Sequence, residues 1–236
     1  MRVDVPPSLG ISVVIPVLDE ELRIGERLME LGRMAGIVEV IVVDGGSRDR
    51  TAEIIRSFPE VRLVSAPRGR GSQMNAGARI ATGEVLLFLH ADVRLPLDAA
   101  TWVGRVLEDP AVVAGAFRTW TVPDAGRSWV TPLLHLADLR SRFTRLPYGD
   151  QALFVRRDVF ERVGGFPDQP LMEDLELSLR LRRVGRIATA PATVRVSGRR
   201  FLVRPIRSAV QMRLFPLLYR LGVPPGLLAR LYGDPR

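Results

Sequence analysis

The 236-residue sequence contains no cysteine and no lysine. The absence of cysteine excludes disulfides, thiolate nucleophiles and zinc sites built on thiolates. The absence of lysine makes all 34 basic residues arginine, so no single arginine stands out as a functional signal. Histidine is almost absent too. His135 is predicted to be a surface or packed residue, whereas His90 accompanies a carboxylate.

Long apolar runs are also missing. No uninterrupted apolar segment approaches the length that crosses a bilayer. The first ten residues include two prolines and an Asp and lack the apolar core of a signal peptide. We therefore expect a cytoplasmic protein, with peripheral contact to the inner face of the membrane as an alternative. The hydrophobic content of 47% predicts a globular core rather than a disordered chain.

The formal net charge is +8. Such a balance suits nucleic acid, an anionic membrane surface or phosphate-bearing substrates, and it is equally compatible with a solvated surface. The arginines are scattered along the chain, and only three Trp and three Tyr offer stacking surfaces beyond Phe. We therefore predict no nucleic-acid partner.

Short apolar runs rich in β-branched residues alternate with helix formers in the first half of the chain. This alternation predicts an α/β fold with a Rossmann-like, mostly parallel sheet flanked by crossover helices. Because ligands of such sheets bind at the carboxyl ends of the strands, the polar residues after each strand form the candidate site. The predicted strands are residues 11–17, 38–43, 61–65 and 85–89, with helices between the first two strands and at 51–58 and 71–81.

The pattern is looser beyond Pro96. Residues 126–145 are predicted to form a helix or a mobile segment rich in Arg and Leu. The remaining predictions are a helix at 101–108, a strand at 112–120, and a turn near residue 149 followed by a strand at 152–155 and a short helix.

The stretch LLFLHADVRLP, residues 86–96, runs from four apolar residues into a histidine and a carboxylate. Alternate residues of a strand share a face, so His90 and Asp92 lie on the same side. A strand-end Asp92 can bind a divalent cation through oxygen, and the cation would bridge to a diphosphate. The alternative is a capping Asp beside a histidine whose hydrogen bonds are satisfied.

In VDGGSRDRT, Asp44 ends a predicted strand and is followed by two glycines. Glycine allows a ligand to approach the backbone closely, and Asp44 could then accept a hydrogen bond from a base or ribose. Equally, Asp44 and Ser47 could serve only as caps of a tight turn.

In RGRGSQMNAGA, Met74 stands where a dinucleotide fingerprint requires its third glycine, so the segment fails that pattern. Arg68 and Arg70 could still bind phosphate beside the start of a helix. A flexible surface loop is the alternative.

The stretch PLMEDLELSLRLRR favours a helix, because Leu, Glu and Arg are helix formers and no β-branched residue is present. Glu173 and Asp174 would lie in its first turn, where the helix dipole favours ionised carboxylates. An ionised carboxylate can act as a general base. The alternative is a pair of acids that only complement the dipole of a surface helix.

Together these stretches resemble glycosyltransferase family 2, the nucleotide-sugar transferases with the GT-A fold. VVIPVLDEE and VEVIVVDGGSRDRT resemble the first two strands of the family, with Gly45 where a second Asp is common. LLFLHADVRLP resembles the metal-binding Asp-x-Asp motif, with His90 in place of the first Asp. YGDQALFVRRDVFERVGGFP and MEDLELSLRLRR resemble the acceptor-side segment and the Glu-Asp motif. The motif variants resemble a small soluble subgroup associated with radical-SAM/selenodomain proteins.

The resemblance implies a metal-dependent, inverting transfer of one sugar from a nucleotide-sugar donor, with a UDP- or GDP-sugar expected, to a hydroxyl of an unidentified acceptor. Asp174 would be the general base and Glu173 would support it. Asp92, with His90, would hold Mg²⁺ or Mn²⁺ on the diphosphate. The nucleotide-sugar site would comprise Pro16, Leu18, Glu20, Asp44, Arg70, Gln73, Asp92 and Arg200, and Gly149, Asp150 and Gln151 would face the donor sugar and the acceptor.

The same resemblance implies a single GT-A domain over residues 1–236. We divide it into a nucleotide-sugar-binding half at 11–115, an acceptor-side half at 116–195 and a C-terminal helical extension at 196–236. The extension contains FLVRPIRSAVQMRLFPLLYRLG, which mixes Arg with bulky apolar residues. Pro205 and Pro216 are expected to interrupt it. This favours helices packed on the core or on a second copy in a homodimer over one long interfacial membrane helix.

Other functions stay open at this point. The Gln-x-x-Arg-Trp motif of processive synthases is absent, which favours a single transfer over polymerisation. A nucleotidyltransferase of similar fold would carry a Gly-rich basic loop after the first strand, where this chain has the acidic PVLDEE. A non-catalytic nucleotide-sugar-binding protein is the other alternative, because the metal motif lacks its first carboxylate.

Overall fold

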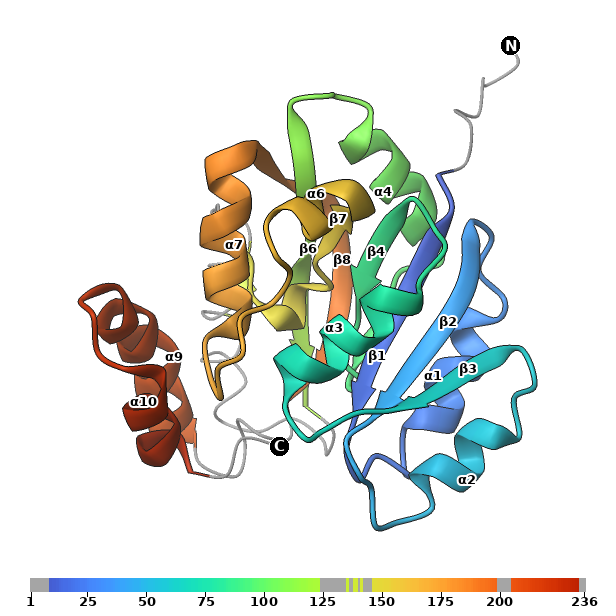
Figure 1. Cartoon of the computed structure of the whole chain (residues 1–236), viewed down its shortest axis with the longest axis horizontal. Helices are drawn as coiled ribbons and strands as arrows, with labels where there is room; N and C mark the ends of the chain where they lie inside the picture. The colour runs from blue at the N-terminus through green and yellow to red at the C-terminus, as the bar shows by residue number, and fades with distance from the viewer. Residues whose placement is uncertain are drawn as a thin grey trace.

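The computed structural model describes residues 9–123, 135, 138–139, 141, 146–198 and 205–233. Most of the segment 126–145 and the site candidate Arg200 lie outside these residues. The described part contains an eight-stranded sheet with the strand order β3-β2-β1-β4-β7-β6-β8-β5 (Figure 1).

The first half of the chain forms the parallel part of the sheet. β1 pairs with β2 on one side and with β4 on the other, and β2 pairs with β3, all in parallel. The predicted Rossmann-like half is therefore confirmed. Its strands are β1 (Ile11–Val17), β2 (Ile37–Asp44), β3 (Val61–Ser65) and β4 (Val85–Phe88), and its helices are α1 (Ile24–Leu31), α2 (Thr51–Arg56) and α3 (Arg70–Ile80).

The rest of the sheet is mixed. β7 (Phe154–Arg156) pairs antiparallel with β4 and with β6 (Val112–Val122), which confirms both predicted strands of this region. β8 (Arg186–Ser197), for which the sequence analysis places no strand, pairs in parallel with β6 and antiparallel with β5 (Val93–Arg94). The register of β8 jumps between its residues 190 and 193. Pro191, which has no N–H to donate, falls within this irregularity.

Successive side chains of a strand point to opposite faces of the sheet, and they contribute to two apolar cores, one on each face. On one face, strand residues such as Val13 and Leu87 pack with α1, α2 and α4 (Ala99–Leu107). On the other face, strand residues such as Val14 and Leu86 pack with α3, α6 (Arg157–Arg162) and α7 (Glu173–Val184). Helices therefore cover both faces, and the loops after β1, β2 and β4 meet at one edge of the sheet (Figure 1).

Two helices, α9 (Pro205–Arg220) and α10 (Pro225–Tyr232), lie beside α7 and confirm the predicted helical extension (Figure 1). The expectation that Pro216 interrupts this stretch is wrong, because α9 continues through it. Packing offsets the hydrogen bond that the proline removes: Phe215 and Leu228 are buried against Leu171, just before α7. Within the described ranges, no helix has the length and apolar character needed to cross a membrane.

Candidate active site

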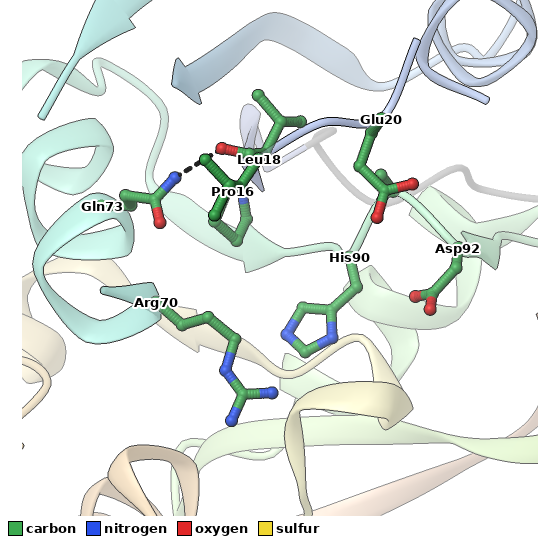
Figure 2. A pocket seen from close by; sticks show the side chains of 9 residues that line it. Pro16, Leu18, Glu20, Arg70, Gln73, His90 and Asp92 are labelled. Atoms are coloured by element: carbon green, nitrogen blue, oxygen red, sulfur yellow. Dashed lines mark hydrogen bonds between the residues drawn. The ribbon is translucent and has the colours of Figure 1, made fainter. Parts of the chain in front are cut away.

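A recess lies at the carboxyl ends of β1 and β4. Figure 2 shows Arg70 reaching toward His90 from α3, while Glu20 and Asp92 lie on the other side of the imidazole. The structure thus brings together residues that are far apart in the sequence, as the strand-end argument predicts. The predicted site residues that line the recess are Pro16, Leu18, Glu20, Arg70, Gln73, His90 and Asp92.

The loop after β1 is tied to the loop after β2. The backbone N–H of Asp19 donates to Ser47 Oγ at 3.0 Å, and the N–H of Glu20 donates to Thr51 Oγ1 at 2.8 Å. In return, the N–H of Arg48 donates to Asp19 Oδ1 at 2.8 Å. Polar residues of the VDGGSRDRT segment therefore hold the wall of the recess in place.

Gln73 is a brace beneath the recess. Its Nε2 donates to the carbonyls of Val17 at 2.9 Å and Val43 at 2.8 Å, which joins the ends of β1 and β2 to α3. A Cβ on Gly45 would lie 3.0 Å from this amide, so the glycine leaves the room that Gln73 occupies. Gln73 lines the recess, but both of its amide donors already serve the backbone.

Asp44 ends β2 and is 8% exposed. Its carboxylate accepts hydrogen bonds from the backbone N–H of Ser47 at 3.1 Å and from the Ser47 hydroxyl at 2.5 Å. Asp44 pairs in register with Val17, a lining residue, but does not itself line the recess. The structure thus shows the turn-capping bonds, and a contact between Asp44 and a nucleoside stays a prediction.

Arg70 connects the recess to α7. Its Nε lies 2.8 Å from Glu173 Oε1, and Glu173 is only 2% exposed. Burial raises the pKa of Glu173, although the Arg70 guanidinium opposes this change. Burial acts to lower the pKa of Arg70, but the carboxylates of Glu173 and Asp174 outweigh it and raise that pKa. Glu173 therefore orients a charged Arg70 over the recess.

A larger cleft adjoins the recess and shares Arg70, His90 and Asp92 with it. Gly149 and Asp150, in the short 3-10 turn η1 (Gly149–Gln151), line this cleft. The opposite wall is apolar and comes from the C-terminal helices. Its residues, Met212, Phe215, Pro216 and Tyr232, were not predicted as site residues, and the mixture of Arg and bulky apolar residues in that stretch is the only sequence signal for them.

Asp174 lies in the first turn of α7, as predicted, and lines the cleft. Its Oδ2 accepts a hydrogen bond from the backbone N–H of Gly149 at 2.8 Å, and its Oδ1 accepts one from the N–H of Leu175 at 2.7 Å. A Cβ on Gly149 would lie 2.8 Å from the His90 ring. The base candidate, the η1 turn and the metal candidate therefore meet in one place.

Gln151, which was expected to meet the sugar, is buried and does not line the cleft. The side chain is 1% exposed. Its Oε1 accepts from the backbone N–H of Tyr148, and its Nε2 donates to the Phe117 carbonyl, both at 3.1 Å. A buried amide with these partners fixes the η1 turn that presents Gly149 and Asp150.

Backbone strain gathers around the recess and the cleft. Among the described residues other than glycine, positive φ angles occur at Asp19, Ala152 and Met172. Asp19 lies between two recess residues, Ala152 follows η1, and Met172 precedes Glu173. Such conformations cost roughly 1–3 kcal/mol each and persist where surrounding contacts enforce them, which is common at functional sites.

His90 and Asp92 could supply two ligands to a divalent cation, which is fewer than such an ion requires. They offer an imidazole nitrogen and a carboxylate, and both line the recess and the cleft. The described ranges hold no group of three or more His, Asp or Glu side chains arranged to bind a metal. The remaining ligands would come from a bound substrate and water. Carboxylate and water ligands suit both Mg²⁺ and Mn²⁺.

Comparison with known sequences identifies the family. Residues 12–164 match the family model described as Glycosyl transferase family 2, and the chain belongs to this family. It is 28% identical over 211 residues to the probable glycosyltransferase YdaM of Bacillus subtilis, covering 78% of this chain and 49% of that protein. It is 31% identical over 169 residues to an undecaprenyl-phosphate 4-deoxy-4-formamido-L-arabinose transferase of Pseudomonas aeruginosa, covering 64% and 48%. The chain thus spans about half the length of these relatives.

Solved structures share the fold. The mannosyltransferase PcManGT from Pyrobaculum calidifontis, in complex with GDP-Man and Mn²⁺, has a TM-score of 0.68 at 25% identity and covers 92% of this chain and 66% of that chain. S. aureus TarS 1–349 in complex with UDP-GlcNAc has a TM-score of 0.62 at 19% identity and covers 80% and 58%. Together with the sheet and its flanking helices, these likenesses confirm the predicted GT-A fold.

Proposed function

We propose that this chain is a metal-dependent, inverting glycosyltransferase that moves one sugar from a nucleotide-sugar donor to an acceptor hydroxyl. The observation that carries the proposal is the position of Asp174. Its carboxylate lines a cleft that shares Arg70, His90 and Asp92 with the adjoining recess. A donor with its nucleotide in the recess would hold its sugar in the cleft, beside this carboxylate.

Asp174 would accept the proton of the acceptor hydroxyl while the oxygen attacks the anomeric carbon, because a hydroxyl is a weak nucleophile without a base. Attack opposite the leaving group inverts the anomeric configuration. Arg70, oriented by Glu173, would offset the negative charge that the departing nucleoside diphosphate gains. Asp92 and His90 would hold Mn²⁺ or Mg²⁺, which adds positive charge at the same group when bound.

The donor is proposed to be a UDP- or GDP-sugar, and the complex of PcManGT with GDP-Man and Mn²⁺ supports this class. Pro16, Leu18 and Glu20 would contact the nucleotide. Asp44, at the end of β2, would accept a hydrogen bond from its base or ribose. Arg200, outside the described residues, would close over the diphosphate. In this proposal residues 11–115 bind the donor and residues 116–195 form the acceptor side, within one domain that ends in the helical extension. Membership of the radical-SAM/selenodomain-associated subgroup stays a prediction.

The test uses the purified chain with UDP-, GDP-, ADP- and dTDP-sugars, each with Mn²⁺, Mg²⁺ or a chelator. We expect one donor to raise the melting temperature only with metal, and Asp92→Ala to abolish the rise, because binding stabilises the folded state by mass action. Slow release of the nucleoside diphosphate through hydrolysis of that donor reports the chemistry without an acceptor.

In the same assay, Asp174→Asn should still bind the donor but lower hydrolysis about 100-fold or more, as expected for a lost general base. Asp168→Asn, on an exposed carboxylate nearby, is the matched control and should match wild type. Donor binding with equal, negligible turnover in all three proteins would instead support a binding protein. Release of pyrophosphate from a nucleoside triphosphate and a sugar phosphate would support nucleotidyl transfer.

We also propose that α9 and α10 contact the inner face of the membrane. Val210, Leu214 and Leu217 recur along α9 and are 51%, 42% and 54% exposed. Arg213 and Arg220 on the same helix are also exposed, and their charge suits anionic lipids. The name of the undecaprenyl-phosphate transferase supports an acceptor presented at a membrane.

Co-sedimentation with anionic and neutral vesicles tests this contact. Wild type should sediment with the anionic vesicles, and a Leu214→Glu/Leu217→Glu variant should not. The alternative outcome is that wild type does not sediment with vesicles and forms a dimer in light scattering, and that the same variant loses this dimer. These results would show that α9 and α10 contact a second copy of the chain and not a membrane.

A further inference from the structure

A third hollow, which we name the arginine pocket, lies next to Asp92. It shares only Asp92 with the recess, and it shares Asp92, Val196 and Ser197 with the cleft. It is therefore continuous with the acceptor side of the site but distinct from the nucleotide recess. Its walls come from α1, β5 and the ends of β6 and β8: Arg23, Glu26, Arg27, Asp92, Arg94, Val122, Pro123, Arg195, Val196 and Ser197.

Arg27 is the unusual member of this pocket. It is only 3% exposed, and its Nε has no hydrogen-bond partner among the described residues. Its one ion-pair partner there is Glu30, which lies three residues further along α1 and outside the pocket lining. Burial lowers the pKa of Arg27, against the attraction of Glu30. A buried guanidinium with an unused donor is costly unless a ligand completes its hydrogen bonds.

Glu20 and Glu30, outside the lining, pair with Arg23 and Arg27, but arginines outnumber carboxylates in the lining of the pocket itself. Four arginines line it, against the two carboxylates of Glu26 and Asp92. Arg94 already pairs with Glu26 and Glu30. Arg195, exposed near the end of β8, makes no ion pair or side-chain hydrogen bond within the described ranges. Arg195 can therefore turn toward a ligand without breaking an ion pair or a side-chain hydrogen bond to any described residue.

We propose that the arginine pocket binds a phosphate group. Guanidinium groups match phosphate oxygens in planar, two-pronged hydrogen bonds and are the preferred side chains for this purpose. Val122, Pro123 and Val196 add apolar walls, which strengthen charge interactions by excluding water. The phosphate comes either from the donor diphosphate, reaching past Asp92, or from a phosphorylated second ligand that extends from the cleft.

The first test is a titration of the purified chain with inorganic phosphate at constant ionic strength, followed by thermal unfolding. We expect a saturable rise in melting temperature. Arg195→Gln should weaken the apparent affinity about tenfold, as for one lost charge-assisted hydrogen bond, and Arg195→Glu should weaken it further. Arg182→Gln, on the exposed face of α7, is the control and should behave as wild type.

The second test repeats the titration with a saturating nucleoside diphosphate and Mn²⁺. An unchanged phosphate response that still depends on Arg195 assigns the site to a second ligand. Competition by the nucleotide, with weaker nucleotide binding in Arg195→Gln, assigns it to the donor diphosphate.

Two results would overturn the site. One is a phosphate response that is absent, or equal in wild type and Arg195→Glu. The other is competition by a nucleotide whose own affinity does not depend on Arg195, because the phosphate would then bind in the recess. Neither result depends on sugar transfer, so failure of this proposal is separable from failure of the proposed enzyme activity.

Discussion

The backbone N–H of Gly149 donates to Asp174 Oδ2 at 2.8 Å and so joins the η1 turn to the first turn of α7. The same glycine touches the other half of the site, because a Cβ at this position would lie 2.8 Å from Cε1 and Nε2 of His90. Gly149 therefore sets the spacing between the base candidate and the metal candidate. A side chain at this position would have to push one of them away.

Gly149→Ala should lower donor hydrolysis or transfer about 100-fold, since a displacement of about 1 Å at a reacting centre has effects of this size. The fold should persist, because the position lines an open cleft. Gly104→Ala in α4 is the control: no atom lies within 4 Å of its added Cβ, and alanine favours a helix by about 0.5–1 kcal/mol. The measurements are the reaction rate and the melting temperature of each variant. Equal activity of the two variants would show that Gly149 does not set the spacing within the site.

Glu173→Gln should weaken nucleoside diphosphate binding about tenfold, because Arg70 loses the carboxylate that orients it. Stability should change little, since burial already raises the pKa of Glu173 and a neutral amide avoids that cost. Calorimetric titration with the nucleotide and Mn²⁺ measures the affinity. Glu176 lies on the same helix as Glu173 and is the partner of Arg180 in α7 and of Tyr219 in α9. As the control, Glu176→Gln should leave the affinity unchanged.

Glu39 should stabilise the protein in a pH-dependent manner. Burial acts to raise its pKa, but hydrogen bonds from Ser12, Thr82 and Arg62 outweigh burial and lower the pKa from 4.5 to about 2. Since the folded-state pKa is depressed, the stabilisation is fully present above pH 4.5 and is lost as the pH falls toward 2.

Glu39→Gln should therefore reduce the free energy of unfolding at pH 7 by about 2 kcal/mol and flatten its dependence on pH between 4.5 and 2. Urea unfolding at pH 7, 4.5 and 3 provides the measurement. The exposed Glu60→Gln is the control and should retain the wild-type slope. A wild-type slope in Glu39→Gln would show that this carboxylate does not govern acid stability.

Gly45 and Gln73 should behave as one unit. Gly45→Ala places a methyl group 3.0 Å from the Gln73 amide and should cost about 1–2 kcal/mol of stability. Gln73→Ala removes hydrogen bonds to the carbonyls of Val17 and Val43 and should cost about 2 kcal/mol. The double variant should be no less stable than Gln73→Ala to within about 0.5 kcal/mol. Additive losses in denaturant unfolding would contradict this coupling.

The parallel half of the fold was predictable because its strands are continuous apolar runs buried on both faces. β1 and β2 stand out in this way, and the polar residues after them had to reach one edge of the sheet. The same argument brought Arg70, His90 and Asp92 together. The hydrogen-bond partner of each side chain could not be predicted in this way. Gln73 braces the ends of two strands, and Gln151 fixes a turn instead of facing a sugar.

β8 escaped prediction because its signal is tertiary. Pro191 and the small residues around it argue against a central strand, and only the register jump opposite β6 accommodates them. The continuation of α9 through Pro216 is similar, since the contact of Phe215 with Leu171 offsets a local penalty. The C-terminal wall of the cleft depends on such contacts and left no motif in the sequence.

The C-terminal wall of the cleft is also the part of the site that is synthesised last. In chain order the residues of the recess come first, then Asp174, and then Phe215 and Leu228. Leu171, directly before the strained Met172, remains uncovered until those two side chains pack on it. The two C-terminal helices therefore add a wall to a cleft whose other lining residues precede them in the chain.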